Sequence, residues 1–192
     1  MSANDKPFLS DVQEIRKRAR EHMEKGAVTS EYRGDLKTVI KLLNEALATE
    51  IVCVLRYRRH HFMAQGLNSD PIAAEFLQHA LEEQQHADSI AARIVQLGGE
   101  PNFDPEGLLS RSHSEYVAGT NLIEMIREDL VAERVAIDSY TEMIRYIGDK
   151  DVTTRRLLEG ILAVEEEHAD DMANFLADIQ SSDWSQRDRS RS

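Results

Sequence analysis

Two stretches of this 192-residue chain decide its fold: LNEALATEIVCVLRY at residues 43–57 and IREDLVAERVAIDSY at residues 126–140. Aligned without gaps, they superpose Glu50 on Glu133 and Tyr57 on Tyr140, in each case 83 residues later. Apolar residues recur at every third or fourth position in both stretches, which is the spacing of one face of an α-helix. The two stretches therefore indicate two copies of one helix.

A second pair of similar segments supports this repeat: EEQQHAD at residues 82–88 and EEEHAD at residues 165–170. Each contains Glu-x-x-His, formed by Glu83 and His86 in the first and by Glu165 and His168 in the second. Residues three positions apart lie on the same helix face, so each pair can close on one ion. His168 follows His86 by 82 residues, which predicts two copies of a helical hairpin.

Start and stop signals divide most of the chain into four long helices, predicted at residues 35–66, 70–98, 121–148 and 151–180. Asp70 and Pro71 form a helix start, Asn121 with Glu124 forms a capping pair, and glycines end the first three helices. Residues 98–119 contain glycine and proline with little periodicity, so they form a long connection. The sequence predicts an all-α four-helix bundle with one long crossover between its second and third helices.

The two ends of the chain are expected to lie outside the bundle, which spans residues 35–180. Residues 1–34 form an N-terminal arm with a short helix from Ser10, with Gln13 as its capping partner, to Gly26. Residues 181–192 form a polar tail. The basic runs IRKRAR and RDRSRS have acidic neighbours, so packing between subunits or a disordered tail is favoured over contact with DNA.

Composition excludes several classes of protein. The net charge of −12 argues against a surface that is built for nucleic acid. No segment is apolar enough for a signal-peptide core or a membrane span, so we expect a cytoplasmic protein without membrane contact. Cys53 is the single cysteine, expected as a small buried residue, so no disulfide can form within the chain. Any metal must therefore be bound by oxygen and nitrogen.

The candidate functional residues are acidic residues that stand on the apolar faces of the predicted helices. Glu50, Glu83, Glu133 and Glu165, one on each predicted helix, stand where leucine or isoleucine would be expected. Burying four carboxylates together is costly unless cations balance them. Two divalent ions would cancel four negative charges, with His86 and His168 as neutral ligands. Oxygen and imidazole ligands suit iron or manganese, whereas zinc more often takes fewer ligands.

With these residues, the chain resembles the ferritin-like superfamily, and within it the bacterioferritin and Dps-like branch, over roughly residues 36–180. The resemblance implies that Glu50 and His86 hold one iron and that Glu133 and His168 hold the other. It implies that Glu83 and Glu165 bridge the two irons. It also implies that Tyr57 matches a tyrosine that is able to donate an electron. It also implies a ferroxidase that oxidises Fe(II) with O₂ or H₂O₂ and stores Fe(III) inside a hollow homo-oligomer.

The chain departs from the bacterioferritin pattern in three places. Gln84 stands where bacterioferritins have a haem-ligating methionine, so no haem is expected. The fourth helix is followed by polar residues and not by an apolar fifth helix, which favours a shell of 12 subunits over one of 24. Cys53 is single, whereas Dps-like relatives with such a centre often carry a cysteine pair.

Two other functions remain open at this stage. The same ligands could serve a di-metal oxidase or a manganese catalase without a storage cage, with manganese or zinc in place of iron. A Dps-type protein that protects DNA is the third hypothesis, and iron chemistry is then secondary.

Several nearby residues have two interpretations. His79 is expected to be exposed, with a place on the way into the site as the alternative. His60 and His61 are expected in a basic patch near the end of the first long helix, with capture of a metal ion as the alternative. Tyr57 is either a core aromatic or an electron donor, and Tyr140 is interpreted as a core aromatic. The glutamates beside the ligands, Glu82, Glu166 and Glu167, are expected to be solvated or to support the ligands.

Overall fold

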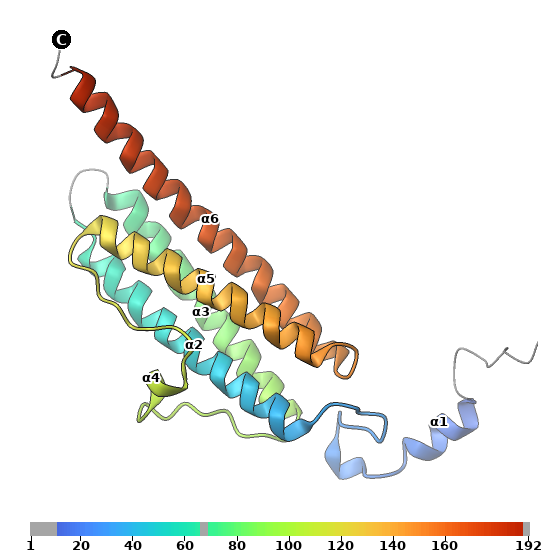
Figure 1. Ribbon diagram of the computed structural model, residues 1–192. Helices are drawn as coiled ribbons and strands as arrows, with labels where there is room; N and C mark the ends of the chain where they lie inside the picture. The colour runs from blue at the N-terminus through green and yellow to red at the C-terminus, as the bar shows by residue number, and fades with distance from the viewer. Residues whose placement is uncertain (1–10, 66–68, 190–192) are drawn as a thin grey trace, which may run out of the picture.

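The computed structural model describes residues 11–65 and 69–189, which form a bundle of four long helices (Figure 1). Along the chain the elements are α1 (Val12–Arg18), η1 (Met23–Lys25), α2 (Leu36–Met63), α3 (Ser69–Gln96), α4 (Leu108–Arg111), α5 (Leu122–Ile147) and α6 (Val152–Arg189). The described residues contain no β-strand, and none of their helices is apolar enough over a sufficient length to cross a membrane. The predicted all-α fold is therefore confirmed.

Polar caps explain where the long helices begin. The Asp35 side chain precedes α2 and accepts a hydrogen bond from a first-turn backbone amide. The side chain of Asn121 accepts from the backbone N–H of Glu124, as the capping pair predicted. Before α6, Asp151 accepts from the backbone N–H of Thr154. Each cap satisfies a backbone donor that the helix itself leaves unpaired.

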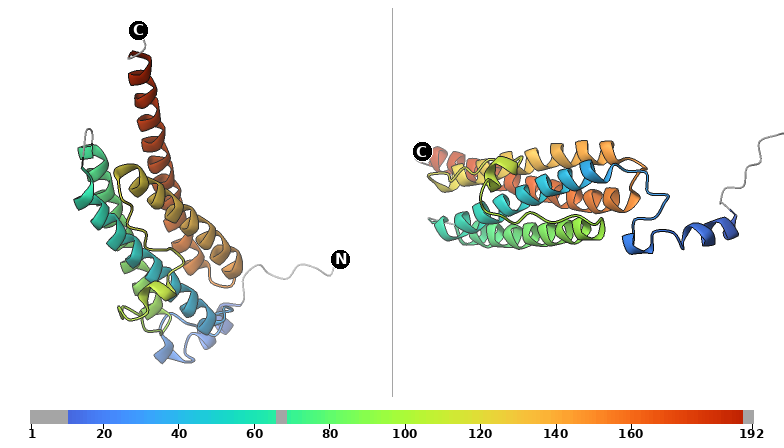
Figure 2. Two further views of the ribbon diagram at one scale, coloured as in Figure 1. Left: turned by 60° about the vertical axis from the view of Figure 1, so that its left-hand side comes forward. Right: turned by 90° about the horizontal axis from the view of Figure 1, so that it is seen from below.

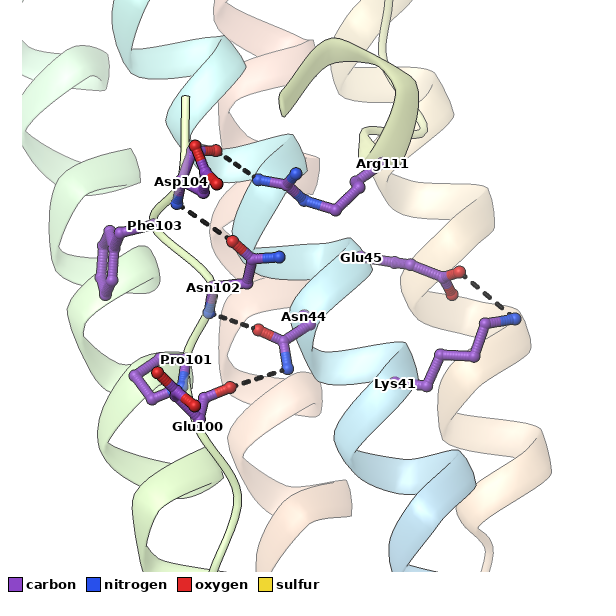
Figure 3. Close-up of a pocket in the computed structure, with 9 residues that line it drawn as sticks. All are labelled: Lys41, Asn44, Glu45, Glu100, Pro101, Asn102, Phe103, Asp104 and Arg111. Carbon is purple, nitrogen blue, oxygen red and sulfur yellow. Dashed lines mark hydrogen bonds and ion pairs between the residues drawn. The ribbon is translucent and has the colours of Figure 1, made fainter. Parts of the chain in front are cut away.

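The four long helices form two antiparallel hairpins, α2 with α3 and α5 with α6, which pack side by side (Figures 1 and 2). A crossover joins α3 to α5 and runs along α2, as the long connection predicted. The Asn44 side chain on α2 fastens it by donating to the backbone carbonyl of Glu100 and accepting from the backbone N–H of Asn102 (Figure 3). A surface pocket of about 730 Å³ lies between α2 and the crossover, and none of the predicted ligands lines it.

The core of the bundle consists of two apolar clusters. The first lies toward the start of α2 and includes Leu43, Leu47 and Ile94. The second lies toward the end of α2 and includes Phe76 and Met172. The buried acidic residues fall between these clusters along the helices. The bundle therefore places a polar layer within an apolar core.

Four boundaries differ from the predictions. The N-terminal helix ends at Arg18, because His22 adopts a left-handed conformation (φ 53°) and a separate 3₁₀ turn follows. The crossover contains the short helix α4. Helix α6 continues to Arg189, where a tail was predicted from residue 181, since residues 181–189 lack the glycine or proline that would break a helix. Helix α2 ends at Met63 with its cap at Ala64, before the stop predicted at Gly66. Ser10, the predicted cap of the N-terminal helix, and Gly66 lie outside the described residues.

Candidate metal centre

One glutamate from each long helix points into the middle of the bundle. Glu50 lies on α2, Glu83 on α3, Glu133 on α5 and Glu165 on α6, and all four are buried. His86 and His168 are buried one turn after the glutamates of α3 and α6. Helical periodicity explains this convergence, because each residue occupies a core-facing position of its own helix.

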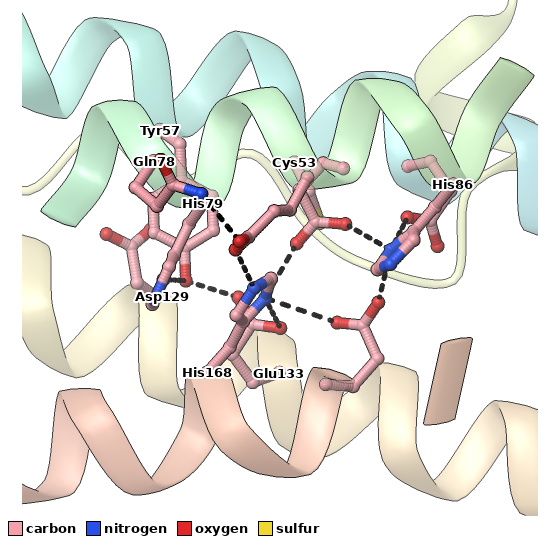
Figure 4. A network of polar contacts seen from close by, with 12 residues as sticks. Cys53, Tyr57, Gln78, His79, His86, Asp129, Glu133 and His168 are labelled. Atoms are coloured by element: carbon pink, nitrogen blue, oxygen red, sulfur yellow. Dashed lines mark hydrogen bonds and ion pairs between the residues drawn. The ribbon is translucent and has the colours of Figure 1, made fainter. Parts of the chain in front are cut away.

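These six residues form two overlapping groups of donor atoms. The first contains Glu50, Glu83, His86 and Glu165, and the second contains Glu83, Glu133, Glu165 and His168. Within each group the donor atoms lie within 4.8 Å of one another. Glu83 and Glu165 belong to both groups, which is the arrangement that bridging ligands require. The structure thus brings together all six residues that the sequence singled out. Figure 4 labels three of them, His86, Glu133 and His168.

Both imidazoles direct Nδ1 at the carboxylates. His86 Nδ1 lies 3.0 Å from a Glu165 oxygen and 3.2 Å from a Glu50 oxygen. His168 Nδ1 lies 3.5 Å from a Glu83 oxygen, while its Nε2 lies 2.8 Å from Glu82. A hydrogen bond from Nε2 to a carboxylate fixes the ring and leaves Nδ1 free to bind a metal. Glu82 therefore orients His168, in agreement with the expected supporting role.

Several donor atoms at the centre lack a hydrogen-bond partner among the described residues. They are both carboxylate oxygens of Glu83, Oε2 of Glu133, Oε1 of Glu165 and Nδ1 of His168. Buried polar atoms without a partner are rare in proteins because each costs free energy. Here they converge on one another. Two divalent ions would satisfy them and balance the four carboxylates, so this donor set fits iron or manganese.

The carboxyl groups compete for protons. Burial, followed by the charge of Glu83, raises the pKa of Glu50 well above its usual range, and the same two causes do so for Glu165. Burial and Glu83 also raise the pKa of Glu133, to about 6. Burial opposes the charge on Glu83 as well, but the nearby imidazoles of His168 and His86, each 3.5 Å away, lower its pKa. The cluster thus concentrates negative charge on Glu83, between the two imidazoles.

The imidazoles hold protons tightly. Burial alone would lower the pKa of His86, but its contacts with Glu50 and Glu83 raise it to about 10. Burial also opposes a charge on His168, and Glu83 and other carboxylates raise its pKa to about 9. A ring nitrogen can bind a metal ion only after it has lost its proton, so metal ions and protons compete for this centre.

Two tyrosines connect the halves of the repeat. Tyr57 on α2 donates a hydrogen bond to Glu133 on α5, and Tyr140 on α5 donates to Glu50 on α2. Tyr140 lies in the apolar core, as interpreted from the sequence, and its hydroxyl also positions a candidate ligand. Its match to Tyr57 in the repeat was the signal that could have predicted this role.

His79 is not exposed as expected. Its side chain is 1% exposed, its Nδ1 lies 3.2 Å from the Tyr57 hydroxyl, and its ring stacks on His168 with centroids 3.9 Å apart. Burial, followed by the charge of His168, lowers the pKa of His79 to about 4. Figure 4 shows His79, His168 and His86 in a row along the bundle. Glu166 and Glu167 are exposed, as predicted.

His60 is buried, in contrast to the predicted basic patch, and forms a polar network beside the centre. Asp129 accepts hydrogen bonds from Arg56 Nε (2.8 Å) and contacts His60 Nδ1 (2.8 Å), and all three side chains are buried. Arg56 also donates to Ser114 and so fastens the crossover. Sequence analysis missed Asp129, although it lies one turn before Glu133 on the same helix face. His61 is half-buried and donates a hydrogen bond from Nδ1 to the backbone carbonyl of Ala73, 2.7 Å away, whereas Cys53 is buried as expected.

Comparisons with known proteins agree with this geometry. Residues 40–182 match the family model of the ferritin-like domain. A bacterioferritin of Desulfovibrio desulfuricans is 30% identical over 131 residues, which are 68% of this chain and 69% of that protein. A nutrient stress-induced DNA-binding protein of Synechococcus is 34% identical over 140 residues, 70% of this chain and 78% of that protein. The structure of a bacterioferritin-related protein from Bacteroides fragilis, described as a dodecameric thioferritin, is 33% identical with a TM-score of 0.77 and covers 80% of this chain and 92% of that chain.

Proposed function

This chain belongs to the ferritin-like family, and we propose that it is a ferroxidase that oxidises Fe(II) at the buried centre and stores Fe(III) in a hollow homo-oligomer. The observation that carries the proposal is the pair of donor groups that share Glu83 and Glu165. Two ions held by shared carboxylates lie close enough to react with one oxidant molecule. Two shared ligands are what a site for a pair of ions needs.

Iron is the substrate in this proposal. Each of two Fe(II) ions loses one electron, and the two electrons reduce one H₂O₂ to two hydroxide ions; O₂ is the other candidate oxidant. Glu83 and Glu165 contact both ion positions, so they stabilise the higher charge of Fe(III) at each. Glu50 and Glu133 are aimed by the hydroxyls of Tyr140 and Tyr57, so their oxygens need little rearrangement when the charge increases.

Tyr57 is our candidate for an additional electron donor. Its hydroxyl donates to Glu133, which can take the proton that leaves the phenol, and its oxygen accepts a hydrogen bond from His79 Nδ1. Tyr140 has the same contact with the opposite glutamate, but no histidine stands at the position that corresponds to His79, which is occupied by Ile161. This difference favours Tyr57 over Tyr140 as the redox-active residue.

A homo-oligomer is supported by exposed apolar side chains and by the relatives. Phe62, Val95 and Val131 are each more than half exposed on the helices of the single chain. Association of subunits that removed these apolar side chains from water would be favourable. The bacterioferritin-related protein from Bacteroides fragilis is described as dodecameric, which favours 12 subunits over 24 in our proposal.

The proposal is tested by loading the apo-protein anaerobically with Fe(II) and then mixing one half with O₂ and the other with H₂O₂. Oxidation is followed by absorbance, and the iron retained by each oligomer is measured after gel filtration. We expect rapid oxidation and retention of far more iron than about two ions per chain. Sedimentation velocity gives the subunit number of the same samples.

A matched pair of variants separates the centre from general charge effects. Glu83→Ala/Glu165→Ala removes the shared carboxylates and should abolish rapid oxidation. Glu166→Gln/Asp170→Asn removes two exposed negative charges from α6 and should leave it unchanged. Retention of only about two metal ions per chain would instead support a di-metal oxidase or a catalase without a cage.

Protection of DNA is the second candidate function, because one relative is named as a DNA-binding protein. The net charge of −12 opposes this function unless the basic residues of the N-terminal arm or the C-terminal segment make the contact. A gel-retardation assay at low salt tests it, together with deletion of residues 1–34 or 181–192. Absence of retardation by the full chain would exclude this function.

A further inference from the structure

A third group of donor atoms lies beside the centre, at the surface between α3 and α6. It consists of Glu75 and His79 on α3 and Asp171 on α6, whose donor atoms lie within 4.8 Å of one another. The carboxylate side chains are 36% and 46% exposed, whereas the imidazole is 1% exposed. This group therefore joins two solvent-accessible anions to one buried nitrogen ligand.

The hydrogen bonds around Tyr57 determine which nitrogen of His79 carries hydrogen. Tyr57 uses its only proton to donate to Glu133, so its oxygen can only accept from His79 Nδ1, 3.2 Å away. In the neutral ring, Nε2 then has a lone pair. That lone pair is directed at Glu75, 3.4 Å away, and at Asp171, 3.5 Å away. A lone pair that faces two carboxylates is unfavourable unless a cation lies between them.

The distances also favour a shared cation over a direct ion pair. An imidazolium that donates to a carboxylate would lie about 2.7–2.9 Å from it. Two ligands about 2.1 Å from one ion in tetrahedral geometry lie about 3.4 Å apart. The ring of His79 is also a poor place for a positive charge, because it is buried and stacks on His168, 3.9 Å away.

We propose that Glu75, His79 and Asp171 bind a divalent cation and form the first step of a route by which Fe(II) reaches the centre. The role in iron uptake rests on the proposed function. His79 also belongs to a group with Glu82 and His168, and His168 belongs to the centre itself. Successive groups therefore share a histidine, so an ion can exchange one ligand at a time while it moves from the surface inward.

The internal repeat shows that the fold does not require these residues. With the 82-residue offset of the two histidine motifs, the positions that correspond to Glu75 and His79 are Leu157 and Ile161, and Ser89 corresponds to Asp171. Val164 likewise corresponds to Glu82. The positions that correspond to the third group hold two apolar residues and one serine, and neither a histidine nor a carboxylate. The third group is therefore a specific property of one half and not a consequence of helix packing.

The test is a count of bound Co(II) by equilibrium dialysis, with visible absorption to report imidazole ligation. The full chain should bind about three ions, two at the centre and one at the third group. Glu75→Gln/Asp171→Asn should bind one fewer and keep the two central ions. These side chains are partly exposed, so the variant should fold normally, and Glu166→Gln/Asp170→Asn is the matched control that should still bind three.

The rate of iron uptake tests the route itself. At low Fe(II), Glu75→Gln/Asp171→Asn should slow oxidation by about tenfold or more, while the final amount of oxidised iron stays the same. An unchanged Co(II) count in this variant would overturn the third site, and an unchanged rate would overturn its role in uptake. Failure of the proposed function is distinguishable, because it appears in the full chain itself: either the two central ions are missing, or Fe(II) is not rapidly oxidised and retained.

Discussion

Loading of the centre with divalent ions at pH 7 should release at least two protons from each chain. The pKa values of about 10 for His86 and about 9 for His168 mean that both imidazoles carry an additional proton at this pH. Each Nδ1 must lose its proton before it can bind a metal. Glu50 and Glu165, whose pKa values are also raised, can add up to two further protons.

Isothermal titration calorimetry measures this number directly. Zn(II) is titrated into chelator-treated protein at pH 7 in two buffers that differ in ionisation enthalpy, and the difference in heat gives the protons released. The apparent affinity should rise about tenfold per pH unit for each proton released. His168→Gln should release about one proton fewer, whereas His22→Gln, on the exposed N-terminal arm, should leave the number unchanged.

A release of less than about one proton per chain would refute this reasoning, because the carboxylates would then not hold protons on the imidazoles.

The same pKa shifts predict how the stability of the folded protein depends on pH. His86 and His168 have raised pKa values in the folded state, so their charged forms stabilise it fully below the pKa of an unfolded histidine, about 6.5. This stabilisation is lost as the pH rises through about 9–10. The chelator-treated protein should therefore become less stable between pH 7 and 10, and the metal-loaded protein should not.

Four substitutions test other parts of the structure. Glu165→Leu removes one of four clustered carboxylates, so it should raise the free energy of unfolding of the chelator-treated protein, measured in urea, by about 1–4 kcal/mol. The same variant should no longer be stabilised by Mn(II). A variant less stable than the unchanged protein would contradict this prediction. Asp129→Ala should lower the free energy of unfolding by about 3–5 kcal/mol, since Arg56 is left buried without its partner, and a loss below about 1 kcal/mol would be inconsistent with that pairing. After rapid oxidation of Fe(II), electron paramagnetic resonance should detect a tyrosyl radical in Tyr140→Phe but not in Tyr57→Phe. The opposite pattern would show that Tyr140, and not Tyr57, is the redox-active tyrosine.

Sequence periodicity was sufficient to predict the bundle and the convergence of the six candidate ligands. A helix position determines its face, so a glutamate in an apolar stripe must point into the core, as Glu50 and Glu133 do. The repeat then predicted that four such residues would lie at one level. These are local properties, since each depends on spacing within one helix and on the similarity of two hairpins.

Tertiary structure alone decided which polar residues near the centre are buried and what they contact. His79 has an ordinary surface sequence context, yet the packing of α6 against α3 encloses it between Tyr57 and His168. Arg56 and Asp129 are 73 residues apart, and only the packing of α2 on α5 makes them partners. The hydrogen-bond direction at Tyr57, and with it the lone pair of His79, follows from contacts among three helices. Periodicity assigns a face to each residue, but only the packed bundle assigns its neighbours.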